Sequence, residues 1–294
     1  MNPKPRNYTV VDVFSSLPLL GNPVAVVLDA DGLDTASMQR IANWTHLSET
    51  TFLLPPTRSD ADYRLRIFTP RSELPFAGHP TLGSAHAALQ CGLVTPRNGR
   101  FVQECALGLV PIEVQASDTG LPQWTLDLPP AALRPLHEDD VRELQAVLGC
   151  AVPGHITPAI IDVGAVWLVA QLDSTAQLLA LQPDLARCAA LERRLGLTGV
   201  TVYAPRQRDH ADVEVRSFAP SCGVDEDPVC GSGNGSVAVF RRERGLLPGA
   251  AQHYNATQGQ CVGRAGHIAI GYHPQGRITI GGACVTSIEG TLRC

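Results

Sequence analysis

Two glycine-containing turns, each directly before a short predicted helix, have the residue types that bind anions. The first turn spans residues 77–80, ahead of a helix predicted over 81–91, and the second spans 230–233, ahead of a helix predicted over 234–244. The first amides of a helix have no intrahelical acceptor, and the helix dipole adds about half a positive charge there. We therefore expect a substrate carboxylate at these turns. The residues expected to bind it are Gly78, Pro80, Gly231, Ser232, Gly233 and Asn234.

These turns also have a purely structural explanation. Glycines at positions 78, 231 and 233 permit tight turns and close packing of a helix on a sheet. A dinucleotide site is a weaker explanation, because the glycines of residues 231–235 have the wrong spacing and no apolar strand directly precedes them. The occurrence of two similar turns in one chain favours anion binding.

Three titratable residues could transfer protons or hold polar groups of a substrate. Glu49 lies at a loop tip before a predicted strand, where an isolated glutamate is ordinarily a surface residue. If it is partly buried in a cleft, its pKa rises from about 4.3 toward neutrality, and it can then act as both acid and base. His79 can hold a polar substrate group or relay a proton, or simply form a hydrogen bond across its turn. Asp227 can anchor the same polar groups, although Asp-Pro is also an ordinary turn former.

Cys230 directly precedes the second helix. A thiol at a helix N-terminus has its pKa lowered below about 8.5, which predicts a reactive thiolate here. The other eight cysteines are scattered without a Cys-x-x-Cys pair, which argues against disulfides and zinc sites, and most free cysteines are small buried residues. Cys230 is therefore either a base or such a spectator.

The elements that position these residues are mostly short strands. Strand-like runs bounded by Gly, Pro, Asp or Asn are predicted over 8–14, 24–28, 51–54, 63–68, 109–114, 124–128, 165–172, 200–204, 213–218, 267–271 and 278–280. Three further helices are predicted over 34–46, from Asp139 to a stop at Gly149, and over 184–195.

An internal repeat relates the two halves of the chain. Arg66-x-Phe68-x-Pro70 recurs as Arg216-x-Phe218-x-Pro220, a constant offset of 150 residues. In both copies a proline, a glycine and a helix of small residues follow. We interpret this as a duplication that yields two domains of one fold, each rich in strands around a central helix.

Composition excludes several classes of function. The 294 residues are 44% hydrophobic and 17% charged, enough for a sizeable core. No apolar run approaches the roughly 20 residues of a membrane span, and the polar start does not fit a signal peptide, so we expect a cytoplasmic protein. The net charge of −5 disfavours nucleic acid. Lys4 is the only lysine, which leaves no credible residue for a pyridoxal-phosphate Schiff base or a phosphate-binding loop.

Several ordered motifs resemble the PhzF family of phenazine-biosynthesis-like proteins over nearly the whole chain. They are GNPVAV at 21–26, LSETTF at 47–52, ELPFAGHPTLG at 73–83, DEDPVCGSG at 225–233, the QG and GR pairs at 258–259 and 263–264, and EGTL at 289–292. The resemblance implies an α+β fold with two pseudo-symmetric domains of the diaminopimelate-epimerase type, each a curved sheet around a helix. We expect these domains over 1–120 and 121–282, with a last strand near 283–288 crossing back to the first.

The resemblance also implies a chemistry. The family's general acid/base corresponds to Glu49, and the polar residues around the substrate correspond to His79 and Asp227. The implied protein is a homodimer that needs no metal or organic cofactor and binds a small carboxylate-bearing substrate in the cleft between its domains. It resembles dihydro-hydroxyanthranilate isomerase.

Position 230 departs from the family pattern. Family members usually have threonine where this chain has Cys230, and a cysteine there resembles diaminopimelate epimerase and proline racemase, which use two cysteines. The matching position in the first half is Ala77, so a two-cysteine mechanism is excluded. Three alternatives stay open: an isomerase with Glu49 as base, an epimerase or racemase using Cys230 with Glu49, and a small-acid binding protein without catalysis.

Overall fold

The computed structural model describes residues 4–116, 120–206, 211–247 and 252–294. It is a mixed α+β structure in which a strongly curved sheet closes into a barrel. The chain forms two compact units: residues 1–126 together with 281–294, and residues 127–280.

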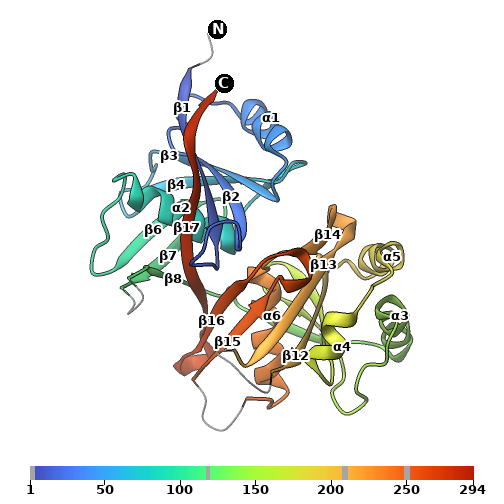
Figure 1. Ribbon diagram of the computed structural model, residues 1–294. Coiled ribbons are helices and arrows are strands. Elements are labelled where there is room, and N and C mark those ends of the chain that lie inside the picture. The colour runs from blue at the N-terminus through green and yellow to red at the C-terminus, as the bar shows by residue number, and fades with distance from the viewer. Residues whose placement is uncertain (1–3, 117–119, 207–210, 248–251) are drawn as a thin grey trace. The chain divides into compact units, whose positions relative to one another are not determined.

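The strands of the first unit form a closed ring. They are β1 (Pro5–Val13), β2 (Asn22–Val27), β3 (Glu49–Leu54), β4 (Tyr63–Phe68), β5 (Glu73–Leu74), β6 (Arg100–Cys105), β7 (Gly108–Gln115), β8 (Gln123–Asp127) and β17 (Ile278–Arg293). From β1 the pairing runs through β2, β3, β4, β6, β7, β8 and β17, and β17 pairs with β1 again. The two ends of the chain therefore lie side by side, as the blue and red strands of Figure 1 show.

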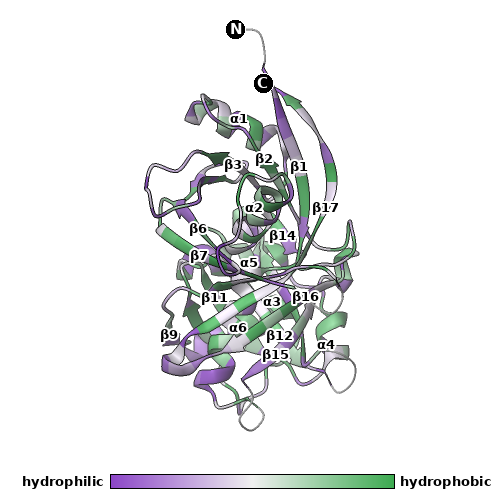
Figure 2. Cartoon of the chain, turned by 90° about the vertical axis from the view of Figure 1, so that its left-hand side faces the viewer, coloured by the Kyte–Doolittle hydropathy of each residue, from purple (hydrophilic) through white to green (hydrophobic). Residues whose placement is uncertain are grey.

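Helix α2 (Gly78–Gln90) is enclosed by this ring. Most of its residues are buried on every side, which is typical of a helix surrounded by structure. Small residues make the enclosure possible: a Cβ on Gly83 would lie only 2.4 Å from Val24 of β2, a strand that Figure 2 shows as hydrophobic along most of its length. Helix α1 (Thr35–Thr45) begins at Asp34, whose side chain accepts a hydrogen bond from the Ser37 amide, and packs outside the strands.

The second unit repeats this scheme. Its strands are β9 (Ala132–Pro135), β10 (Ala159–Asp162), β11 (Val166–Gln171), β12 (Gly199–Pro205), β13 (Val213–Ala219), β14 (Val224–Asp227), β15 (His253–Gln258) and β16 (Gly266–Tyr272). Helix α6 (Gly231–Glu243) is its enclosed helix. Helices α3 (Glu138–Leu148), α4 (Thr175–Ala180) and α5 (Leu185–Leu195) pack outside, over a core that includes Leu144, Leu178 and Leu191.

The repeat is visible in the order of strand pairing. In the first unit β1–β2, β3–β4 and β6–β7 are antiparallel, whereas β2–β3 and β4–β6 are parallel. In the second unit β10–β11, β12–β13 and β15–β16 are antiparallel, whereas β11–β12 and β13–β15 are parallel. The enclosed helix follows the fourth strand of each series, so α2 and α6 occupy equivalent places in the two series.

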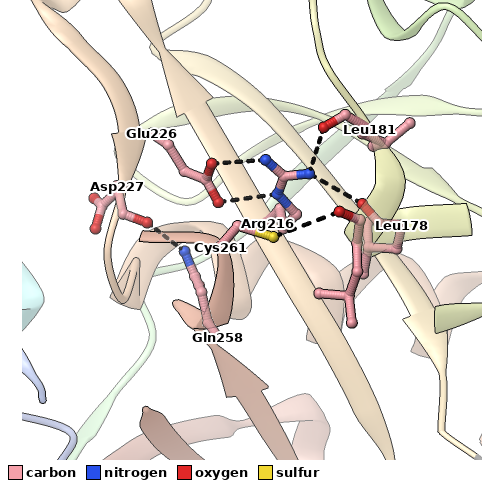
Figure 3. Close-up of polar contacts among 8 residues, drawn as sticks. Leu178, Leu181, Arg216, Glu226, Asp227, Gln258 and Cys261 are labelled. Carbon is pink, nitrogen blue, oxygen red and sulfur yellow. Dashed lines mark hydrogen bonds and ion pairs between the residues drawn. The ribbon is translucent and has the colours of Figure 1, made fainter. Parts of the chain in front are cut away.

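The repeated Arg-x-Phe sequence has the same structural role in both units. Arg66 donates two hydrogen bonds of 2.7 Å to the Glu73 carboxylate, and its guanidinium lies 5.1 Å from the centre of the Phe68 ring. Arg216 donates to Glu226 at 3.0 and 2.8 Å and also binds the carbonyls of Leu178 and Leu181 (Figure 3). We call each of these arginine–glutamate pairs, Arg66 with Glu73 and Arg216 with Glu226, a fork. Each fork links the fourth strand of its unit to the short strand that leads to the enclosed helix.

Most predicted elements are present, with differences at their ends. Both enclosed helices begin three residues earlier than predicted, at Gly78 and Gly231, because proline is tolerated in a first helical turn and glycine can adopt helical angles there. Strand β17 is 16 residues long, since it pairs along the whole of β1. The strands β5, β6, β9, β10, β14 and β15 and the helix α4 were not predicted. None of the helices in the described ranges has the length and apolar character of a transmembrane helix.

The two forks predict unequal losses of stability. The Arg216 side chain is 6% exposed and that of Arg66 is 25% exposed. Arg216→Met leaves Glu226 buried without its partner, and we expect a loss of about 3–5 kcal/mol in the free energy of unfolding. Arg66→Met, the matched control, removes a partly solvated pair and should cost about 1 kcal/mol. Urea unfolding of both variants measures the difference, and equal losses would contradict this account.

Candidate active site

Glu49 and His79 form a close pair in the first unit. Glu49 is the first residue of β3, and His79 is the second residue of α2. The distance between Glu49 Oε2 and His79 Nε2 is 3.3 Å, and the side chains are 16% and 8% exposed. A carboxylate and an imidazole in such contact can pass a proton between them or hold one substrate group between them. The structure thus brings these two predicted residues together.

Burial sets the proton affinity of Glu49. Removal from water disfavours the charged carboxylate and raises the pKa of Glu49 to about 7, while a hydrogen bond with Ser48 acts in the opposite direction. At neutral pH both forms are therefore populated. This role of Ser48 was not predicted from the sequence, although its position directly before Glu49 is a usable signal.

The N-terminus of α2 is open next to this pair. A Cβ on Gly78 would meet no atom within 4 Å, so space remains beside its backbone. Ala77 precedes the helix and makes no side-chain capping bond. The first amides of the helix have no intrahelical acceptor and can bind an anion. Pro80 is buried and has no amide hydrogen, so it cannot donate a hydrogen bond to an anion and can contribute only by fixing the backbone of the first helical turn.

Cys230 caps the corresponding helix of the second unit. Its sulfur accepts a hydrogen bond from the Gly233 amide at 3.2 Å, and its side chain is buried. The predicted thiolate is wrong. Burial raises the pKa of the Cys230 thiol well above its ordinary value, and the nearby charge of Asp227 raises it further, which outweighs the capping hydrogen bond.

Gly233 and Asn234 have structural roles that differ from the expected contact with an anion. A Cβ on Gly233 would lie 2.7 Å from both Thr201 Oγ1 and Ser217 Oγ, so glycine is needed to pack the helix on the sheet. The Gly233 amide is already bound to Cys230. The Asn234 side chain is buried and donates to the Cys230 carbonyl at 2.9 Å, and its backbone amide also binds that carbonyl.

Gly231 and Ser232 remain the residues of this turn suited to a ligand. They are the first two residues of α6, whose amides have no intrahelical acceptor. Ser232 Oγ accepts a hydrogen bond of 3.0 Å from the indole of Trp167, which orients the hydroxyl beside the helix end. Two amides and one oriented hydroxyl are a suitable set of donors for a carboxylate.

Asp227 lies at the end of β14, directly before this turn. Its Oδ1 accepts a hydrogen bond from the Val229 amide at 3.1 Å, and its carbonyl accepts one from Gln258 at 2.8 Å (Figure 3). Gln258 belongs to the QG pair of the family motifs, but the sequence alone predicts no role for it. In the described ranges, no group of three or more His, Cys, Asp or Glu side chains is arranged to bind a metal ion.

Comparison with known proteins extends over nearly the whole chain. A family model described as phenazine biosynthesis-like protein matches residues 11–290. Trans-2,3-dihydro-3-hydroxyanthranilate isomerase from Pseudomonas aeruginosa is 37% identical over 261 residues, which cover 88% of this chain and 87% of the relative. Antisense-enhancing sequence 1 from Schizosaccharomyces pombe is 37% identical over 294 residues, or 97% and 98% of the two chains.

A solved structure shares the fold. A phenazine biosynthesis protein of the PhzF family from Bacillus anthracis matches with a TM-score of 0.89 at 22% identity, covering 99% of this chain and 100% of that chain. This similarity supports the predicted α+β fold, in which a curved sheet encloses a helix.

The raised pKa of Glu49 predicts a specific pH dependence of stability. The folded chain holds the Glu49 proton up to about pH 7, whereas the ordinary pKa is 4.5. The folded state therefore binds more protons in this window, and its stability falls as pH rises through it. Relative to Glu49→Gln, the wild type should lose about 3 kcal/mol between roughly pH 4 and pH 7.5.

Glu104→Gln provides a control of opposite sign. Hydrogen bonds from Thr57 hold the pKa of the Glu104 carboxyl below its ordinary value, so its stabilising contribution is present at neutral pH and is lost as pH falls. Denaturant unfolding at a series of pH values measures both difference curves. If the difference in unfolding free energy between the wild type and Glu49→Gln does not change with pH, Glu49 has the same pKa in the folded and unfolded chains, and the prediction is wrong.

Proposed function

The chain belongs to the phenazine biosynthesis-like (PhzF) family, and we propose that it moves a proton within a small carboxylate-bearing substrate, with Glu49 as general acid and base. Its relatives named for an activity are isomerases, and the chain is an isomerase of this family. The observation that carries the proposal is the largely buried Glu49 carboxyl, with a pKa of about 7, placed 3.3 Å from His79.

In this mechanism Glu49 takes a proton from one carbon of the substrate and returns it to another. The base needs the carboxylate form and the return step needs the acid form, and a pKa near 7 supplies both at neutral pH. His79 holds or relays a proton at a polar group of the substrate. No metal or organic cofactor takes part in the proposed steps.

Stabilisation of the resulting anion is assigned to backbone amides. Each unit contributes one helix N-terminus with a small first residue, Gly78 of α2 and Gly231 of α6. We propose that both bind one substrate in a cleft between the units, with Ser232 as a further donor and Asp227 as the anchor of a polar group. Fixed dipoles aimed at a developing charge lower the barrier without reorganisation.

The epimerase alternative requires Cys230 as a second base. Two observations weigh against it: burial and Asp227 raise the pKa of the thiol, and the sulfur caps α6. The alternative of a binding protein without catalysis does not explain why a carboxyl group with a pKa near 7 lies beside a histidine. We therefore favour Glu49 as the base and Cys230 as a spectator.

Solvent isotope exchange tests the proposal. Trans-2,3-dihydro-3-hydroxyanthranilate, the substrate in the names of three relatives, is the first compound to test, in deuterated water. The wild type should exchange a carbon-bound proton, and Glu49→Gln should lower the rate by about 10²–10⁴-fold. Glu192→Gln is the matched control, because Glu192 is also a buried glutamate with a raised pKa but binds the Ser221 amide. Near-full exchange in Glu49→Gln would refute the mechanism.

Cys230→Ser separates the two catalytic alternatives. A spectator that caps a helix can be replaced by serine, which is a good capping residue, so turnover should persist within about tenfold. Cys284→Ser controls for the general effect of altering a buried cysteine. Collapse of turnover in Cys230→Ser alone, to the level of Glu49→Gln, would favour the epimerase alternative.

A further inference from the structure

Gln258 spans the turn that leads from Asp227 into α6. It is the last residue of β15 and is 1% exposed. Its amide nitrogen donates to the Asp227 carbonyl at 2.8 Å, and its amide oxygen accepts from the Cys230 backbone amide at 3.1 Å. The same oxygen accepts from the Asn234 side chain at 2.8 Å. One buried amide group therefore binds both ends of the turn and the first turn of the helix.

The turn is held firmly from the other side as well. Glu226, the residue before Asp227, accepts the two hydrogen bonds from Arg216 (Figure 3). A Cβ on Gly259, which follows Gln258, would lie 2.6 Å from the Pro228 carbonyl, so the backbone after Gln258 packs directly against the turn. The backbone of Asp227 is thus fixed at two points. Arg216 binds the preceding residue, Glu226, and Gln258 binds the carbonyl of Asp227 itself.

Among its described residues, the first unit has no such arrangement. Gln103 and Glu104 of β6 lie opposite Tyr63 and Arg64, as Ala256 and Thr257 of β15 lie opposite Val213 and Glu214. In the second unit the next pair of this register is Val215 and Gln258. The residue of β6 at the corresponding position is Cys105, the one after Glu104. The turn before α2 instead contacts the β6–β7 hairpin through a backbone bond, from the Leu107 amide to the Pro75 carbonyl.

We infer that Gln258 is a positioning residue for the second half of the active site, which sets the place of Asp227 and of the first amides of α6. The inference rests on the proposed function, because the proposed function assigns Asp227 and the α6 amides their roles in substrate binding and turnover. Gln258 acts through these groups and need not touch the substrate. Its loss shifts the turn and so lowers turnover in the folded enzyme.

Gln258→Met tests the inference, because methionine has a similar length and makes none of the three bonds. Turnover of the folded variant should fall by about tenfold or more. The Gln258→Met, Asp227→Asn and double variants form a mutant cycle. If Gln258 acts through Asp227, the double variant should lose much less activity than the product of the two single losses. Simple multiplication of the two losses would overturn the role of Gln258 in placing Asp227, since losses at independent sites multiply.

Amide hydrogen exchange provides a readout that does not depend on the reaction. The Cys230 amide is bound to Gln258, so it should exchange slowly in the wild type and at least tenfold faster in Gln258→Met. Equal exchange rates would overturn the inference. Gln145→Met is the matched control, since the Gln145 side chain also accepts a hydrogen bond from a backbone amide of the same unit, that of Val152 at 3.3 Å. It should change neither turnover nor Cys230 exchange.

The two proposals can fail separately. Wild-type turnover in Asp227→Asn would remove the catalytic part of the inference, whereas exchange retained in Glu49→Gln would refute the proposed base and leave the Cys230 result standing. If Gln258→Met does not fold, Gln258→Glu replaces it. A glutamate at this position can still accept the hydrogen bonds from the Cys230 amide and the Asn234 side chain, but in its charged form it cannot donate one to the Asp227 carbonyl. Gln258→Glu should therefore still lower turnover, whereas the Cys230 amide should exchange as slowly as in the wild type.

Discussion

Enclosure of a helix by a ring of strands is the constraint on which the rest of the structure depends. A helix buried on all sides must be built from small residues, which is why Val24 lies against Gly83 in α2 and Thr201 against Gly233 in α6. Backbone amides at the end of such a helix lie in a region of low dielectric constant, where their charge acts strongly on a ligand. The fold thus places, in each unit, a helix end whose backbone amides are suited to bind an anion.

The two units use this common frame differently. In the first, the helix end lies beside a titratable pair, Glu49 and His79, and the turn before the helix has no side-chain cap. In the second, a sulfur caps the helix, and Gln258 binds the turn from the adjacent strand. The two helix ends are equivalent in the order of the strands, but the side chains around them differ: a titratable pair lies beside one, and a hydrogen-bonded polar frame surrounds the other.

Local patterns explain what could be predicted from the sequence. Strands such as β4 follow from alternating apolar residues between turn formers, and α1 follows from the capping Asp34, because these signals are local. The roles of Gly233 and Gln258 depend on partners far away in the sequence, which local sequence patterns do not reveal. The thiol of Cys230 shows the limit most clearly, since proximity to a helix end predicts a lower pKa, whereas burial and Asp227 raise it.

The same physical effect therefore assigns opposite roles to two buried groups. Burial favours the neutral form of any acid, and for a carboxyl with an ordinary pKa of 4.5 this moves the pKa toward 7, where both forms are present. A thiol starts from 9.0, so burial moves it further from neutrality and keeps it protonated. In a closed, apolar barrel a carboxylate becomes a better acid and base at neutral pH, and a cysteine becomes a worse one. Glu49 is thus the residue that burial suits for proton transfer, whereas Cys230 is suited to capping a helix.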